Sequence, residues 1–220
     1  MSKYYWCNEK SKKKGEQETP EEEGPPSIIF MGDPGAGPPD SCVDVVDNTI
    51  MFYGEVNEKN AKLLNKALRQ LDKELQIFKL KYGCDSPPLR LFINSYGGNV
   101  FSGFSIMDTI KNCVTPVHTY VDGSAASAAT LISVVAKKRY IFANSFMLIH
   151  QLSSSMWGNY EAMKDEMENL DLIMDRIKKI YKEHTNMSTR QITSVLKKDK
   201  WFEAEVCLEL GLVDEIVENG

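Results

Sequence analysis

The chain has 220 residues, of which 42% are hydrophobic and 26% are charged, an ordinary balance for one domain with a good-sized core plus tails. Its net charge of −5 argues against a surface built mainly for nucleic acid, and no apolar run is long enough to span a membrane. The first residues lack the basic-then-apolar order of a signal peptide, and the five cysteines show no CxxC spacing. We therefore expect a cytoplasmic protein, or one made in a host cytoplasm, with free thiols and with no metal or other cofactor.

The first 41 residues differ in composition from the rest of the chain. The charge blocks of "KSKKKGEQETPEEEG" and the Pro/Gly-rich "DPGAGPPDS" hold too little apolar surface to offset chain entropy. We predict a disordered N-terminal tail over residues 1–41 and one globular domain over residues 42–220.

Strand-like and helix-like runs alternate from residue 43 onward. Strands are expected at 49–54, 89–94, 116–122, 138–144, 146–151 and 212–217. Apolar residues three or four apart predict helices that begin near 57, 100, 128, 159 and 203, and "STRQ" at 188–191 is typical of a capping box that opens another. The alternation predicts an α/β fold with a largely parallel sheet.

Chemically useful residues gather at three corners where a predicted strand turns into the next segment. Gly97 and Gly98 in "NSYGGN" offer bare backbone amides, Ser127 ends "GSAAS", and His150 ends the apolar run "FMLIH". In open α/β sheets, sites lie at the carboxyl ends of strands. Together these residues supply a nucleophile, a base and an oxyanion-binding amide, which are the parts needed for acyl transfer. Two simpler interpretations stay open: Ser127 as a helix N-cap and His150 as a buried strand-end side chain.

Five short motifs, in register from Thr49 to Val217, carry a resemblance to a known family. The stretches "INSYGG", "GSAAS", "MLIHQ", "DKWFEA" and "GLVDEI" resemble the proteolytic subunit of the Clp protease, a serine peptidase of the crotonase-like fold. The resemblance implies an α/β fold of repeated β-β-α units with a protruding handle helix. It also implies site residues, namely Ser127 as nucleophile, His150 as general base, Asp199 as the third triad member, and the backbone amides of Gly98 and Ala128 as the oxyanion hole.

The same resemblance implies how such a chain works. It would hydrolyse unfolded or translocated polypeptides inside an oligomeric chamber, a homo-oligomeric ring of seven subunits, with two stacked rings as an open alternative. The helix from 159 to 184 would join the rings, and an ATP-dependent unfoldase is a candidate partner. Neither a cofactor, a metal, nucleic acid nor a membrane is implied.

Several departures indicate a divergent member. Tyr96 replaces the family's usual proline, "QLSSSMWG" replaces a proline and glycine pair after the histidine, and the N-terminal region does not match the family's axial loop. Other functions therefore stay open: a processing protease for one viral or structural partner, a weakly active structural subunit, or an acyl-CoA hydratase or isomerase of the same fold. Asp214 in "GLVD" is a rival to Asp199 as third triad member.

Overall fold

The structure, a computed structural model, describes residues 41–154 and 157–217. The tail predicted over 1–41 therefore lies outside the described residues, apart from Ser41. The strands are β1 (Val43–Val46), β2 (Thr49–Tyr53), β3 (Leu89–Ser95), β4 (Val117–Ala126), β5 (Lys138–Phe142), β6 (Phe146–Ile149), β7 (Lys200–Phe202) and β8 (Glu215–Val217). The helices are α1 (Glu58–Tyr82), α2 (Val100–Asn112), α3 (Ala128–Val134), α4 (Tyr160–His184), α5 (Thr189–Leu196) and α6 (Ala204–Glu209).

One sheet organises the fold. Its strands run in the order β1-β2-β3-β4-β5-β8, with β6 beside the second half of β4 and β7 on the far side of β6. The pairs from β2 to β5, β4–β6 and β5–β8 are parallel, while β1–β2 and β6–β7 are antiparallel. The predicted α/β fold with a largely parallel sheet is confirmed.

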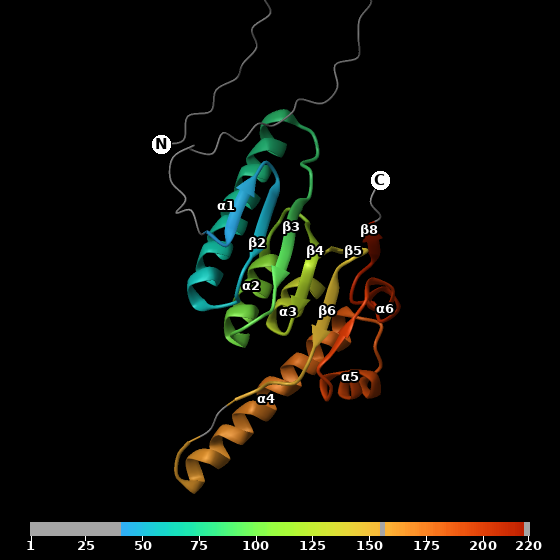
Figure 1. Ribbon diagram of the computed structural model, residues 1–220. Helices are drawn as coiled ribbons and strands as arrows, with labels where there is room; N and C mark the ends of the chain where they lie inside the picture. The colour runs from blue at the N-terminus through green and yellow to red at the C-terminus, as the bar shows by residue number, and fades with distance from the viewer. Residues whose placement is uncertain (1–40, 155–156, 218–220) are drawn as a thin grey trace, which may run out of the picture.

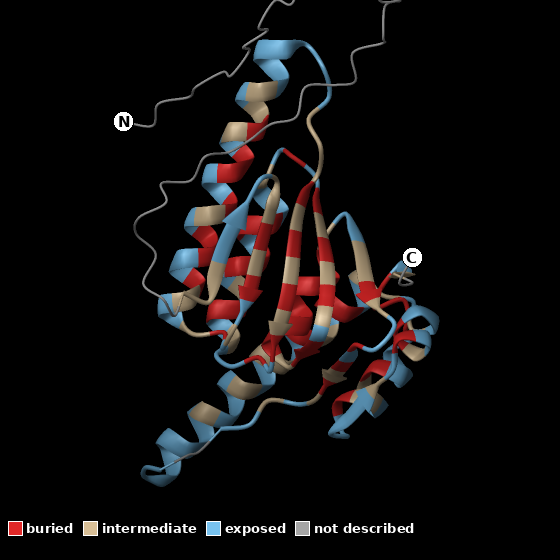
Figure 2. Ribbon diagram, turned by 45° about the horizontal axis from the view of Figure 1, so that its top comes forward, coloured by how far each residue is buried: buried red, intermediate tan, exposed pale blue. Residues whose placement is uncertain are grey.

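Helices α1, α2 and α3 cover one face of this sheet (Figure 1). Along β3 every second residue is buried, because alternate side chains of a strand point to opposite faces. The buried apolar residues of α1 recur every three or four positions, which places them in one stripe against the sheet (Figure 2): Ala61, Leu64, Leu68, Leu71 and Leu75. The core therefore lies between the sheet and these three helices.

Helix α4 behaves differently along its length. Its buried residues, Ile177, Ile180 and Tyr181, all lie near its C-terminal end. Its first half extends away from the sheet (Figure 1) and leaves large apolar side chains in solvent, with Tyr160 76% and Leu172 71% exposed. The protruding helix expected from the sequence is thus present. No helix within the described ranges is long and apolar enough to cross a membrane.

The structure departs from the sequence predictions at three strands. β1 and β7 were not predicted, and both belong to the antiparallel pairs. They have only four and three residues and mostly face solvent, and both are shorter than the strands that the sequence predicted. β4 continues through "GSAA" to Ala126, where a turn was predicted. Pairing with β6 holds Ser124 to Ala126 in the sheet, and only Ser127 breaks away.

Candidate active site

Ser127 forms a sharp corner between β4 and α3. Its backbone has φ 54° and ψ −126°, a conformation in which a residue with a side chain is strained. Its N–H donates to the Leu148 carbonyl of the neighbouring strand at 2.9 Å, so the sheet holds the corner in place. The Ser127 side chain makes no capping hydrogen bond to α3. Ser127 thus stands at the N-cap position of α3, as the simpler interpretation expected, but its side chain does not form the hydrogen bond that makes a serine a good cap.

The Gly97–Gly98 turn packs directly against this corner. A Cβ atom on Gly97 would lie 2.5 Å from the Ala126 carbonyl oxygen and 2.6 Å from the Ser127 Cβ. Both glycines have positive φ, 91° and 140°, so the turn needs residues without a side chain. The Val56 N–H donates to the Gly97 carbonyl at 2.8 Å. Among the hydrogen bonds formed outside the helices and strands of residues 41–154 and 157–217, none has the amide of Gly98 or of Ala128 as donor.

His150 and Asp199 come together because β6 and β7 pair. The antiparallel register sets Ile149 opposite Lys200, so the next residue of each strand, His150 and Asp199, also face each other. His150 Nδ1 lies 3.5 Å from Asp199 Oδ1. The His150 side chain is 26% exposed and that of Asp199 is 81% exposed. The two side chains therefore form a long, solvent-exposed contact rather than a buried hydrogen bond.

The same strand brings His150 to the side of Ser127. β4 and β6 are parallel neighbours with Ala126 beside Leu148, and adjacent strands lie about 4.8 Å apart. Ser127 and His150 therefore leave the same edge of the sheet from adjacent strands. Within the described residues no hydrogen bond joins their side chains. Ser127, His150 and Asp199 thus lie at this edge of the sheet, and among the described residues the side-chain contact formed between them is that of His150 with Asp199.

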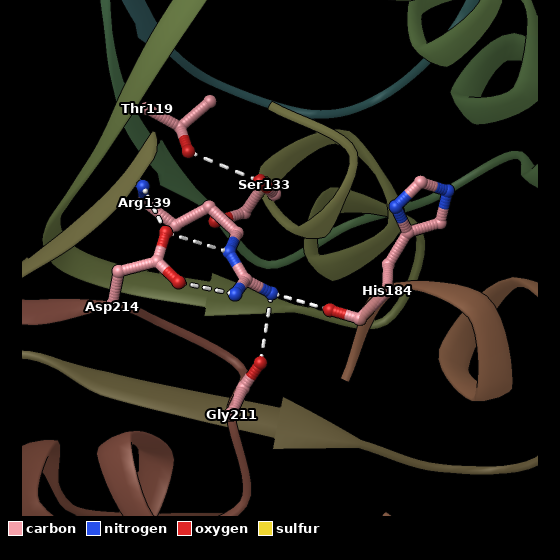
Figure 3. Close-up of polar contacts among 6 residues, drawn as sticks. All are labelled: Thr119, Ser133, Arg139, His184, Gly211 and Asp214. Atoms are coloured by element: carbon pink, nitrogen blue, oxygen red, sulfur yellow. Dashed lines mark hydrogen bonds and ion pairs between the residues drawn. The ribbon is translucent and has the colours of Figure 1, made fainter. Parts of the chain in front are cut away.

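Asp214, the rival to Asp199, is engaged elsewhere (Figure 3). Its carboxylate accepts hydrogen bonds from the Arg139 Nε at 3.0 Å and from the Arg139 backbone N–H at 2.9 Å, and forms an ion pair with the Arg139 Nη2 at 2.5 Å. The Arg139 Nη1 also donates to the carbonyl oxygens of His184 and Gly211. Arg139 thereby ties together both ends of the segment from His184 to Asp214, and that segment carries Asp199.

The charge of Arg139 governs the ionisation of Asp214. Partial burial acts to raise the pKa of this carboxyl group, but the hydrogen bonds and the charge of Arg139, with Lys138 nearby, outweigh it and hold the pKa below its usual value. The other two histidines lie apart from Ser127. His118 is on β4 beside Tyr140, and burial lowers its pKa. Burial and the charge of Lys111 likewise lower the pKa of His184 at the end of α4.

Two aromatic side chains that were not predicted as site residues flank the site. Tyr96, just before the glycine turn, meets Trp201, just after Asp199, edge to face with ring centroids 6.1 Å apart. They are 77% and 39% exposed. Trp201 could not be placed from sequence because its strand, β7, was not predicted. In the described ranges no three His, Cys, Asp or Glu side chains gather as metal ligands.

The match to known proteins covers most of the domain. Residues 42–220 match the family model described as Clp protease. The chain is 36% identical over 133 residues to ATP-dependent Clp protease proteolytic subunit 3 of Streptomyces coelicolor, an alignment covering 60% of this chain and 61% of that protein. It is 32% identical over 146 residues to proteolytic subunit 2 of Treponema pallidum, covering 66% and 73% of the two chains.

A solved structure agrees with the fold. A point mutant of ClpP1 from Listeria monocytogenes superposes with a TM-score of 0.68 at 29% identity, covering 78% of this chain and 92% of that one. The crotonase-like α/β fold expected from the sequence is thereby confirmed. Since the family model spans more than half of the chain, this chain belongs to the Clp protease family.

Proposed function

We propose that this chain is a serine endopeptidase that hydrolyses peptide bonds of unfolded or translocated polypeptides. Ser127 is the nucleophile, His150 the general base, and Asp199 the carboxylate that orients the imidazole. The backbone amides of Gly98 and Ala128 bind the oxyanion. The observation that carries the proposal is the β6–β7 register, which sets Asp199 3.5 Å from His150 at the sheet edge where Ser127 turns out of β4.

The chemistry follows from these positions. The Ser127 oxygen attacks the carbonyl carbon of the substrate while His150 takes the hydroxyl proton, because a serine hydroxyl is a weak nucleophile at neutral pH. The negative charge that develops on the carbonyl oxygen is stabilised by the two amides. His150 then gives the proton to the leaving amine, and water repeats the sequence on the acyl-enzyme. Asp199 holds the imidazole in the tautomer that accepts at the nitrogen facing Ser127, without taking the proton itself.

We also propose a homo-oligomeric chamber, a ring of seven subunits, with pairing of two rings through α4. Helix α4 supports this because its projecting half leaves Tyr160, Met163, Met167 and Leu172 exposed, and several exposed apolar side chains on one helix are typical of an interface. An ATP-dependent unfoldase is a proposed partner, since the relatives are named as subunits of an ATP-dependent protease. A native mass measurement tests assembly: a particle of seven or fourteen chains supports it, and a monomer contradicts it.

Labelling with a fluorophosphonate probe tests the peptidase assignment. The wild-type protein is expected to label at one serine and to cleave a short fluorogenic peptide, and Ser127→Ala is expected to lose both. Ser124→Ala is a matched control, because Ser124 lies on the same strand with its hydroxyl bonded to Asn94 Oδ1 at 3.2 Å. Retained labelling in Ser127→Ala, or a wild-type protein that neither labels nor cleaves, contradicts the proposal. The second result is also the one expected of a structural subunit or a hydratase.

A further inference from the structure

A chain of hydroxyl groups runs from α4 to the Ser127 corner. The Thr130 hydroxyl donates to the Ser127 carbonyl oxygen at 2.6 Å, and the Thr130 backbone N–H donates to the same oxygen at 3.0 Å. Thr130 Oγ1 also lies 2.5 Å from the hydroxyl oxygen of Tyr181 on α4. Both side chains are buried, with Thr130 0% and Tyr181 2% exposed. The proposed peptidase mechanism uses neither residue.

The direction of these hydrogen bonds is fixed by the number of protons. A threonine hydroxyl carries one hydrogen, and that of Thr130 is given to the Ser127 carbonyl. Thr130 must therefore accept from Tyr181, so the chain reads Tyr181 O–H to Thr130 O–H to the Ser127 carbonyl. Burial raises the pKa of Tyr181 well above its ordinary value, although the contact with Thr130 acts in the opposite sense. The tyrosine consequently keeps its proton, and the chain keeps its direction, at any neutral pH.

The oxygen at the end of the chain belongs to the peptide that carries one of the proposed oxyanion donors. The Ser127 carbonyl and the Ala128 N–H are the two polar groups of a single planar trans peptide, and they point in opposite directions. Any contact that fixes the carbonyl therefore also fixes where the Ala128 N–H points. This control matters here because Ser127 has a non-helical ψ of −126°. Its carbonyl oxygen is held by one backbone N–H of α3, that of Thr130, and by the Thr130 hydroxyl, so the hydroxyl chain shares with the helix the control of this peptide plane.

The tyrosine is in turn held by the end of its helix. The Thr185 backbone N–H and hydroxyl both donate to the Tyr181 carbonyl oxygen, at 3.0 Å and 2.6 Å. Tyr181 also belongs to the short part of α4 that is buried against the rest of the domain, together with Ile177 and Ile180. The C-terminal end of α4 is thus a rigid support from which one hydroxyl reaches the corner.

We propose that Tyr181 and Thr130 are positioning residues: they orient the Ser127–Ala128 peptide so that the Ala128 N–H meets the oxyanion, and they link α4 to that orientation. This inference rests on the proposed peptidase function and adds two residues and a structural connection to it. Loss of either hydroxyl leaves the nucleophile and the base in place and lets the peptide plane turn.

The test uses Tyr181→Phe, Thr130→Val, the double variant and Thr130→Ser in the full chain, with hydrolysis of a fluorogenic peptide and inhibition by a peptide boronate. Removing an oxyanion donor costs about 10²–10³-fold in kcat, and a misdirected donor costs less, so we expect a loss of about 10-fold in Tyr181→Phe and in Thr130→Val, with KM within about twofold. The adduct of the boronate resembles the tetrahedral intermediate, so the affinity of each variant for the boronate should fall in proportion to its kcat/KM. The double variant loses no more than Thr130→Val, and Thr130→Ser keeps activity.

The possible failures can be told apart. An active wild-type protein with Tyr181→Phe and Thr130→Val variants that match its kcat contradicts the positioning role alone. The positioning role is likewise contradicted if the losses multiply in the double variant, or if Thr130→Ser is as impaired as Thr130→Val, because either result means that packing is affected rather than the hydroxyl chain. A wild-type protein without hydrolysis or labelling overturns the proposed function and the positioning role with it.

Discussion

Asp199 and Asp214 should respond in opposite ways to the same chemical change. In Asp214→Asn the carboxylate that pairs with the Arg139 guanidinium group becomes a neutral amide. The Arg139 side chain, which is only 14% exposed, then keeps its charge without its ionic partner. Breaking a buried ion pair costs about 3–5 kcal/mol. Because the Asp214 side chain is 40% exposed and the amide keeps one oxygen acceptor, we expect a loss of about 2 kcal/mol. For a domain of this size that corresponds to a fall in Tm of about 4–8 °C.

Asp199→Asn should leave the Tm unchanged and lower turnover. Its side chain is 81% exposed, so its pairing with His150 adds little stability. Replacing the aspartate of a buried triad by asparagine lowers kcat by about 10⁴. Because Asp199 lies 3.5 Å from His150 and is largely exposed, we expect it to orient the imidazole less strongly than a buried aspartate would, and its replacement to lower kcat by about 10²–10³-fold.

Thermal unfolding and steady-state hydrolysis of a fluorogenic peptide, measured on both variants, separate the two roles. We expect Asp214→Asn to have a lower Tm than wild type. After correction for the folded fraction, its kcat should lie within about twofold of the wild-type value. The assignment of Asp199 as the third triad member would be refuted if Asp214→Asn lost most of its kcat with an unchanged Tm while Asp199→Asn kept the wild-type kcat.

Two further outcomes follow from the glycine turn and from the Arg139 ion pair. Gly97→Ala should abolish hydrolysis and lower the free energy of unfolding, measured with denaturant, by at least about 2 kcal/mol, since its Cβ would lie 2.5 Å from the Ala126 carbonyl oxygen. Gly83 is the control, because it also has a positive φ but a Cβ there would meet nothing within 4 Å. Gly83→Ala should lower the free energy of unfolding by about 1 kcal/mol and keep activity. The folded pKa of Asp214 lies below the ordinary 3.8, so the ion pair stabilises the protein above that pH and its contribution disappears as the pH falls through the lower folded value. Wild-type Tm should therefore fall more steeply than that of Asp214→Asn below about pH 4, and parallel curves would contradict this.

The sequence predicted the long elements well because their apolar periodicity matches the burial observed. Asn57 and Ser188 cap α1 and α5, and Gln191 completes the capping box expected of "STRQ". The strands that the sequence did not predict, β1 and β7, are short segments that pair with the edge of a longer strand. A strand of three residues, Lys200–Phe202, is too short to show a periodicity of its own, and β7 forms because it pairs with the edge of β6.

The candidate site shows the same division. Ser127 and His150 stand out in the sequence because each ends an apolar strand. The residues around Asp199 are mostly lysines, so the sequence alone favours a solvated surface charge at this position. Only the resemblance to a family indicated a role in the site. The contacts of Asp214 with Arg139, 75 residues away in the chain, and of Thr130 with Tyr181, 51 residues away, depend on tertiary packing that no local pattern encodes.

The backbone at Ser127 has an evolutionary consequence. Within the described residues five glycines adopt positive φ, and the other residues that do so are Asp47 and Ser127. Asp47 lies in the tight turn between β1 and β2, where an aspartate tolerates this conformation. Ser127, at φ 54° and ψ −126°, has the geometry that a II′ turn ordinarily gives to glycine, at a cost of about 1–3 kcal/mol. Selection for stability alone would favour glycine here, so a lineage that no longer needed the hydroxyl would become more stable through Ser127→Gly.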